Sequence, residues 1–296
     1  MIRPPFFVFA AVAALAASLL ATNEVSALPR WLLWTLTVAA ALLALHELLE
    51  RPLPFLRWSF LRMALGTKTL LRDWQVGDGR EEGAARFVAE HAKAGDLDSA
   101  IRTIDDYARH KSFLINVGDE KGVLLDAVIE RVRPRLVLEV GAYVGYSALR
   151  IARKLPPGGR LVSVEFNADN AAIARRIVEH AGAADRVTFV AGYLGDGGKT
   201  RSQLAEQHGF ASGSLDVVFL DHDKDAYLPD LKLLLDAGWL HPGSVVVADN
   251  VGFPGAPEYR AYMEAEEGKT WRTRVHQTHV EYQKMIPDVV LESTLL

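Results

Sequence analysis

The sequence contains no cysteine, which rules out disulfide bonds, thiolate metal sites and a cysteine nucleophile. It also lacks an excess of positive charge, because 33 lysines and arginines stand against 37 aspartates and glutamates, giving a formal net charge of −4. A protein that binds nucleic acid by neutralising phosphates has the opposite balance. The 296 residues suffice for one large domain or two small ones. These absences limit the chemistry of the protein without identifying its compartment.

Long apolar runs are confined to the first 50 residues. Pro5–Ala21 and Trp31–Leu49 are two such runs, separated by a short polar patch. A bilayer core requires about 20 apolar residues of helix. We therefore expect residues 1–50 to form a membrane anchor of one or two transmembrane helices. A cleaved signal peptide is an alternative for the first run, and two buried core helices are a second alternative.

Residues 51–78 mix basic side chains with tryptophan, phenylalanine and leucine, which predicts a basic amphipathic linker or a helix in the membrane interface. The basic residues that follow the second apolar run are Arg51, Arg57, Arg62, Lys68 and Arg72. Positive charge beside a membrane-spanning helix marks the cytoplasmic side. The expected location is therefore a membrane, with the remainder of the chain facing the cytoplasm.

Residues 79–296 alternate between helical and β-rich patterns. Amphipathic helices are expected over 81–92, 98–111 and 119–132, the second capped by Asp98 and Ser99. Five short β-rich runs, separated by helical ones, follow at 135–140, 160–166, 186–192, 215–221 and 243–250. Buried strands joined by helices form a parallel, doubly wound sheet. Such sheets bind ligands outside the carboxyl ends of their strands, so the strand ends are the candidate site.

The ends of the first two strands indicate a positively charged nucleoside ligand. Glu139 precedes the glycines Gly141 and Gly145, which permit a tight turn into the next helix. The G-x-G-x-x-G spacing of a dinucleotide site is lacking, and an acid at this position would repel a pyrophosphate but suit a sulfonium or ammonium group. Glu165, at the end of the second strand, is placed to bind ribose hydroxyls. S-adenosylmethionine is the candidate cofactor.

The ends of the fourth and fifth strands indicate a hard cation. Asp221 follows the fourth strand, and Asp249 and Asn250 follow the fifth. Oxygen ligands of this kind suit Mg²⁺, which keeps open positions for water and substrate, whereas thiolate or multi-histidine sets for zinc are lacking. Lys224 lies three residues beyond Asp221, where an amine beside the cation and the cofactor would act as a general base.

From about residue 79 to its end, the chain resembles catechol O-methyltransferase, whose membrane-bound form also has an N-terminal anchor. The matching segments are INVGDEKG, VLEVGAYVGYSALRIAR, VVFLDHDKDAYLPD, VVVADNVGFPGAPEY and VEYQK, in this order along the chain. The resemblance implies the class I methyltransferase fold, a Rossmann-like, doubly wound and mostly parallel sheet of seven strands.

The resemblance also implies a role for each matching residue. Asp221, Asp249 and Asn250 would hold Mg²⁺, Lys224 would take a proton from one catechol hydroxyl, and Glu281 would hydrogen-bond the other. The residues implied to bind S-adenosylmethionine are Val117, Glu139, Gly141, Tyr143, Ser147, Glu165, Phe166 and His222. The walls of a shallow substrate cleft would be Phe113, Asp223 and Pro254.

Several positions depart from the family pattern. Asp223 and Phe113 stand where the family has tryptophans, and Leu194 and Gly195 replace a serine–glutamine pair that contacts adenine. One side of the cleft is therefore more acidic and the adenine pocket looser, so an amine-bearing substrate facing Asp223 is one hypothesis. The histidines His276 and His279 are interpreted as structural or cleft-lining residues.

The sequence leaves two alternatives open beside a membrane-anchored, Mg²⁺-dependent catechol-type O-methyltransferase. One is a methyltransferase of the caffeoyl-coenzyme-A type, which acts on a different vicinal diol. The other is a membrane adaptor that keeps the fold with little turnover, against which the set Asp221, Lys224, Asp249, Asn250 and Glu281 argues. No nucleic-acid partner is expected.

Overall fold

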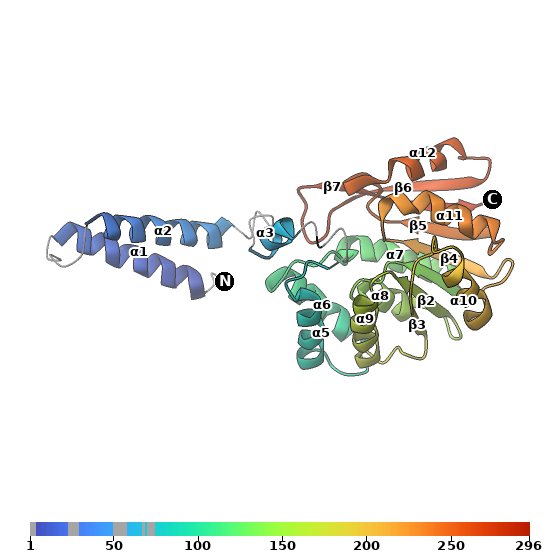
Figure 1. The fold of residues 1–296 in the computed structure, drawn as a ribbon, viewed down its shortest axis with the longest axis horizontal. Helices are drawn as coiled ribbons and strands as arrows, with labels where there is room; N and C mark the ends of the chain where they lie inside the picture. The colour runs from blue at the N-terminus through green and yellow to red at the C-terminus, as the bar shows by residue number, and fades with distance from the viewer. Residues whose placement is uncertain (1–3, 23–29, 50–57, 67–68, 70–74) are drawn as a thin grey trace. The chain divides into compact units, whose positions relative to one another are not determined.

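The computed structural model describes residues 4–22, 30–49, 58–66, 69 and 75–296. The chain forms two compact units, Met1–Gly66 and Thr67–Leu296 (Figure 1). The boundary between them lies inside residues 51–78, the predicted linker, of which residues 51–57, 67–68 and 70–74 lie outside the described residues.

The first unit contains the helices α1 (Pro4–Thr22), α2 (Arg30–Leu49) and α3 (Trp58–Leu65). The helices α1 and α2 lie side by side (Figure 1). Within the described ranges, no helix combines the length and the apolar character needed to cross a membrane, so the predicted transmembrane helices are not found. Of the basic residues used to orient the chain, Arg62 lies in α3, whereas Arg51, Arg57, Lys68 and Arg72 lie outside the described residues.

From residue 75 onward, the second unit first forms the helices α5 (Arg80–His91), α6 (Leu97–His110) and α7 (Gly118–Val132). Strands and helices then alternate, as the sequence predicts. These elements are β1 (Leu136–Val140), α8 (Tyr146–Lys154), β2 (Arg160–Glu165), α9 (Ala168–His180), β3 (Val187–Ala191), α10 (Lys199–His208), β4 (Leu215–Leu220), the short η2 (Lys224–Ala226), α11 (Tyr227–Asp236) and β5 (Leu240–Ala248). The chain ends with η3 (Val251–Gly255), α12 (Pro257–Ala265), β6 (Trp271–His279) and β7 (Pro287–Leu295).

The seven strands form one sheet in the order β3-β2-β1-β4-β5-β7-β6. The strands β1 to β5 pair in parallel, and β7 pairs antiparallel with both β5 and β6. The seven-stranded, mostly parallel prediction is confirmed. The strand order reverses between β1 and β4, the position at which doubly wound sheets form a binding crevice beyond their carboxyl ends.

Helices cover both faces of the sheet (Figure 1). Side chains of successive strand residues point to opposite faces, so each strand contributes apolar side chains to both helical layers. In β1, Val137 packs with residues of α5 to α9, whereas Leu136 and Leu138 pack with residues of α10, α11 and α12 on the other face (Figure 1). These apolar layers hold the strands rigidly in register. The polar strand ends are therefore fixed relative to one another.

The N-terminal cap of α6 differs from the prediction. The capping side chain is Asp96, whose Oδ1 accepts a hydrogen bond of 2.9 Å from the Ser99 amide. Asp98 lies inside the first turn and pairs with Arg153 at 2.7 Å. The physical reason is that Asp96 has the extended backbone of a cap, so its carboxylate can reach back to the free amides.

Candidate active site

The carboxyl ends of β4 and β5 lie side by side, and each is followed by an aspartate. Leu220 and Ala248, the last residues of the two strands, are in register. Asp221 and Asp249 come next, and the Asp249 amide donates a hydrogen bond of 3.0 Å to the Leu220 carbonyl. Asn250 follows with a φ of 54°, in the left-handed region. Asp221, Asp249 and Asn250, the predicted metal ligands, are thus brought to one edge of the sheet.

The Lys224 amine is held against the first of these aspartates. Its Nζ lies 3.1 Å from Asp221 Oδ1 and donates a hydrogen bond of 2.7 Å to the Tyr227 hydroxyl. The Tyr227 hydroxyl in turn donates to the carbonyls of Leu220 and Asp249, which ties it to both strands. The turn η2 begins at Lys224, and this turn places the amine at the strand ends.

A second lysine, Lys121 of α7, enters the cluster from below the β6–β7 loop. Its Nζ lies 2.9 Å from Asp249 Oδ1, 2.6 Å from Glu281 Oε1 and 3.1 Å from Asp288 Oδ2. All four side chains are buried, with Lys121 only 1% exposed. Glu281, the predicted substrate contact, therefore lies in the same cluster as the predicted metal ligands.

The buried charges shift one another's protonation. Burial raises the pKa of Asp249 to about 7, with the charge of Lys121 opposing the rise and that of Asp221 adding to it. Burial likewise raises the pKa of Asp221, against the charges of Lys224 and Lys121. Burial alone would lower the pKa of Lys121, but the surrounding carboxylates outweigh it and raise that pKa well above its ordinary value. The lysine is thus protonated, and the cluster would gain from a further cation.

The oxygens left over in this cluster suit a divalent cation. Asp249 Oδ2 is buried and makes no hydrogen bond to any described residue. The Asn250 amide nitrogen donates to Glu281 at 3.2 Å and to Asp288 at 2.9 Å, which leaves its Oδ1 available as a ligand. Among the described residues, no three histidine, cysteine, aspartate or glutamate side chains form a metal-binding group, so the candidate set depends on the Asn250 amide. Carboxylate and amide oxygens fit Mg²⁺.

The turn after β1 is built around Glu165. Glu165 Oε2 accepts hydrogen bonds of 2.9 Å from the amides of Ala142 and Tyr143, and its Oε1 accepts one of 2.9 Å from Asn167. Gly141 has a φ of 101°, and a Cβ atom there would lie 2.3 Å from the Asp221 carbonyl oxygen. Only glycine fits this position. The predicted ribose-binding acid therefore also shapes the glycine turn.

Glu139 is completely buried in β1 beneath this turn. Ser163 donates a hydrogen bond to its Oε2, whereas its Oε1 accepts none from the described residues. Burial raises the pKa of Glu139 to about 7, and the hydroxyl groups of Ser147 and Ser163 oppose the rise. An unpaired, buried carboxylate oxygen is a suitable partner for a cationic group of a ligand.

Tyr143 lies in the same turn, and its hydroxyl has a partner that the sequence did not indicate. The Tyr143 hydroxyl donates a hydrogen bond of 2.9 Å to Glu81 of α5, and both side chains are buried. Tyr143 also has a left-handed φ of 47°. Val117 is buried immediately before α7 begins.

The predicted adenine side is partly open. His222 Nε2 lies 2.9 Å from Asp230 Oδ2, and its buried Nδ1 makes no hydrogen bond within the described residues. Phe166 is 55% exposed and packs its ring at a tilt against Tyr193, with 5.8 Å between the ring centroids. Leu194, in place of the family's serine, is fully buried. An exposed aromatic ring beside β2 is thus available to a planar ligand.

The three predicted cleft walls differ in exposure. Phe113 is buried, and its carbonyl accepts a hydrogen bond of 2.6 Å from Arg80. Asp223 is exposed, and its Oδ1 accepts a hydrogen bond of 3.2 Å from the Asp225 amide. Pro254 is also exposed and lies in η3, next to the metal-ligand candidate Asn250. Asp223 and Pro254 are therefore free to meet a substrate.

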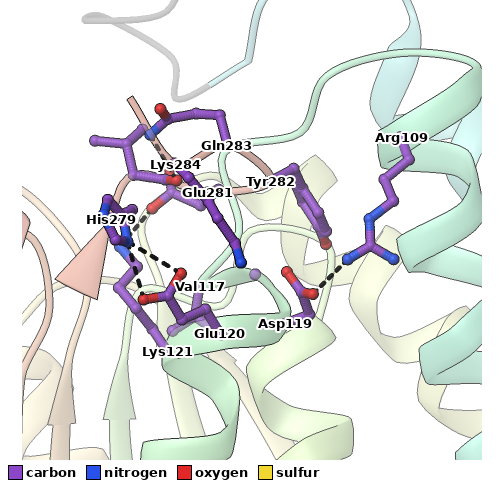
Figure 2. A pocket seen from close by; sticks show the side chains of 12 residues that line it. Arg109, Val117, Asp119, Glu120, Lys121, His279, Glu281, Tyr282, Gln283 and Lys284 are labelled. Atoms are coloured by element: carbon purple, nitrogen blue, oxygen red, sulfur yellow. Dashed lines mark hydrogen bonds and ion pairs between the residues drawn. The ribbon is translucent and has the colours of Figure 1, made fainter. Parts of the chain in front are cut away.

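A cavity of about 350 Å³ lies between the start of α7 and the β6–β7 loop (Figure 2). Lys121 and Glu281 line it together with Val117, so it borders both the carboxylate cluster and the predicted cofactor site. Polar and charged side chains make up most of its other walls: Arg109, Asp119, Glu120, His279, Tyr282, Gln283 and Lys284. Figure 2 shows the Glu120–His279 and Arg109–Asp119 pairs on two sides of the opening.

Sequence reasoning missed Lys121 and Asp288. The buried face of α7 includes Gly118, Lys121, Gly122, Leu125 and Asp126, spaced three and four residues apart. A lysine at such a position points into the protein and needs acidic partners. The helical spacing of INVGDEKG could have identified Lys121, whereas Asp288 belongs to a strand that the pattern did not predict.

Comparison with known proteins assigns the family. A family model described as O-methyltransferase matches residues 97–282. A probable O-methyltransferase of Mycobacterium tuberculosis is 58% identical over 234 residues, covering 79% of this chain and 100% of that protein. The catechol O-methyltransferase of Bos taurus is 40% identical over 249 residues, covering 84% of this chain and 89% of that protein.

Among solved structures, the O-methyltransferase TomG of Streptomyces achromogenes, in complex with SAM, matches this chain with a TM-score of 0.53 at 23% identity. The match covers 72% of this chain and 96% of that chain, and it shows a shared Rossmann-like methyltransferase fold. The matched segment 97–282 includes α7, the strand ends of β1 to β5 and Glu281. This chain belongs to the O-methyltransferase family.

Proposed function

We propose that this O-methyltransferase moves the methyl group of S-adenosylmethionine to one hydroxyl of a catechol-like substrate, with Mg²⁺ bound at the site. The observation that carries the proposal is the cluster at the ends of β4 and β5, where Asp221, Asp249 and Asn250 lie with Lys224 and Glu281. A bovine relative at 40% identity bears the name catechol O-methyltransferase, which supports this substrate class.

The cofactor assignment rests on charge and on the glycine turn. S-adenosylmethionine supplies an activated methyl group on a sulfonium, and its methionine end carries an ammonium. Glu139, with one unpaired oxygen, would bind that cationic end, with Ser147 beside it. Glu165 would bind the ribose hydroxyls at the turn that it shapes, and His222 and Phe166 would flank the adenine. The solved structure of TomG contains SAM on the same fold.

The metal assignment rests on the donor set. Asp221, Asp249 and Asn250 would hold Mg²⁺ through hard oxygens. Asp249 Oδ2 is buried without a hydrogen-bond partner among the described residues, and the hydrogen bond from the Asn250 amide nitrogen to Asp288 leaves the amide oxygen available. When bound, the ion supplies positive charge that makes a nearby hydroxyl easier to ionise.

The side chains of this protein would then divide the remaining work. The Lys224 amine, held by Asp221 and Tyr227, would take the proton from the reacting hydroxyl. Glu281 would accept a hydrogen bond from the neighbouring hydroxyl and so fix which oxygen faces the methyl group. The buried walls around Asp249 and Glu139 exclude water from a reaction in which charge is neutralised.

The test is transfer of a labelled methyl group from S-adenosylmethionine to a panel of catechols, with and without a chelator. We expect transfer to vicinal diols and none to a monophenol of matched size. The chelator should abolish transfer, and added Mg²⁺ should restore it. Caffeoyl-coenzyme A belongs in the panel, because preference for it would assign the other vicinal-diol class. Transfer to the monophenol at the catechol rate, or full transfer in the chelator, would overturn the proposal.

A further inference from the structure

Lys121 occupies a position that lysine seldom takes. It lies on the inward face of α7, one turn after the helix begins at Gly118, and its side chain is 1% exposed. A buried ammonium is costly unless it is paired and hydrogen-bonded. Its surroundings should therefore explain why it is there.

The ammonium joins three carboxylates that come from three separate segments. Asp249 follows β5, Glu281 lies in the β6–β7 loop and Asp288 lies in β7, at 2.9, 2.6 and 3.1 Å from Lys121 Nζ. The ammonium donates hydrogen bonds to Glu281 and Asp288, and it forms an ion pair with Asp249. The lysine thus connects α7 to the segment that follows β5, to the β6–β7 loop and to β7.

Asp288 extends this connection to the segment that carries Pro254. Its Oδ1 accepts hydrogen bonds from the amides of Gly252 and Phe253, at 3.2 and 2.9 Å. Its Oδ2, which faces Lys121, also accepts one from the Asn250 amide nitrogen at 2.9 Å. The orientation of the Asn250 amide therefore depends on a carboxylate that Lys121 holds.

The loop that carries Glu281 rests on α7. A Cβ atom at Gly118 would lie 3.3 Å from the Glu281 Cβ and 3.4 Å from its Cα, so the two backbones nearly touch. On the far side of the loop, the Tyr282 hydroxyl donates a hydrogen bond of 3.0 Å to Asp105 of α6. Between these contacts, Lys121 and Asn250 are the donors that fix the Glu281 carboxylate itself.

The formal charges of the cluster match one divalent ion. Four carboxylates, those of Asp221, Asp249, Glu281 and Asp288, are in contact with two lysines, Lys121 and Lys224. When both lysines are protonated and all four carboxylates are ionised, the excess is two negative charges, which a single dication balances. Without Lys121 the excess would be three.

We propose that Lys121 is a positioning residue that serves as a built-in cation of the active site. It fixes Glu281, and through Asp288 the Asn250 amide, and it reduces the negative charge of the cluster to that of one divalent ion. The charge-setting part of this inference rests on the proposed Mg²⁺ site, whereas the positioning part does not.

The positioning role is tested by Lys121→Met, which keeps the bulk of the side chain and removes its charge. In the full chain with chelator present, we expect the melting temperature to fall by roughly 10 °C, because three buried carboxylates lose their partner. Amide hydrogen exchange of residues 280–288 should accelerate by about tenfold or more.

Lys224→Met is the matched control, since Lys224 contacts one carboxylate, that of Asp221, and should leave exchange of this loop as it is. Lys121→Gln provides a neutral variant that keeps a hydrogen-bond donor, should Lys121→Met fail to fold. Unchanged exchange of residues 280–288 in a folded Lys121 variant would overturn the positioning role.

The charge-setting role is tested by titrating Mg²⁺ alone into the cofactor-free protein in a calorimeter. Lys121→Gln, which keeps a hydrogen-bond donor for the cluster but removes the charge, should tighten Mg²⁺ binding by about tenfold or more, because the cluster then carries one more uncompensated negative charge. Equal or weaker binding would overturn this role. Neither measurement requires methyl transfer, so the inference and the proposed reaction fail independently.

Discussion

The Lys224 amine is held by Asp221 at 3.1 Å and by the Tyr227 hydroxyl at 2.7 Å, which keeps it directed at the strand ends. If it is the general base, Lys224→Ala should lower kcat on the order of 10² to 10⁴-fold, with the affinity for S-adenosylmethionine unchanged. Lys224→Arg should be similarly impaired, because a guanidinium stays protonated and cannot accept the proton. Single-turnover methyl transfer measures the effect. Full activity in Lys224→Ala would remove the residue from the mechanism.

Glu139 predicts a pH dependence of cofactor binding. Its pKa is raised to about 7 by burial, so below pH 7 most of the free protein holds a proton there that a cationic ligand must displace. The affinity for S-adenosylmethionine should therefore rise with pH, by about tenfold between pH 6 and pH 8. Calorimetry with saturating Mg²⁺ measures this, and Glu139→Gln should flatten the profile. Equal affinities at both pH values would show that Glu139 does not meet the cation.

The exposed Asp223 stands where the family has a tryptophan, and it predicts the charge of the preferred substrate. A carboxylate at the cleft should favour a catechol with an amine-bearing side chain, by about threefold to tenfold over an anionic one at low salt. Asp223→Trp should remove this preference without abolishing turnover. Comparing kcat/KM for cationic and anionic catechols measures it, and an identical ratio in the variant would end the hypothesis.

Among the elements, α6 offers a direct test of a helix cap. Asp96 accepts the Ser99 amide at 2.9 Å, so Asp96→Ala should lower the free energy of unfolding by about 1 kcal/mol. Asp96→Asn is the matched control and should be nearly neutral, since an amide oxygen caps equally well. Urea unfolding measures both. A destabilisation of the same size in Asp96→Asn would mean that the charge, and not the cap, matters.

The elements also show where sequence patterns suffice and where they fail. The buried strands β1 to β5 follow from short, β-rich and largely apolar runs, such as Leu215–Leu220, in which only Asp216 is less than fully buried. The edge strand β6 did not follow, because most of its residues are polar and face solvent on one side. In β7, Asp288, Glu292 and Ser293 are buried, which hides the apolar signature of a strand.

The same limit applies to the site. Each predicted residue at a strand end, such as Asp221 or Glu139, could be found because the carboxyl ends of parallel strands meet at one edge. Lys121 and Asp288 lie far apart in the sequence and act by contact with each other at 3.1 Å. A single sequence does not state such contacts. They follow only once the packing of α7 against the sheet, at β4 and β6, is known.

For the whole molecule, the position of the hydrophobic core along the chain indicates which of the two compact units carries the fold and the candidate site. The two apolar layers of the sheet consist of residues between Ala84 and Leu291, and the site residues lie between Glu81 and Asp288. Both ranges fall inside the second compact unit, Thr67–Leu296. Folding and chemistry are thus assigned to the same unit.

A fragment of residues 67–296 should therefore fold and catalyse on its own. Its melting temperature should lie within about 4 °C of that of the full chain, which corresponds to about 1 kcal/mol for a domain of this size. Its kcat for methyl transfer should match that of the full chain within about twofold, because each residue of the acid and lysine cluster is retained. Calorimetry and methyl transfer on the two proteins, purified under the same conditions, measure this. A fragment that is inactive or melts far below the full chain would show that residues before Thr67 stabilise the catalytic unit.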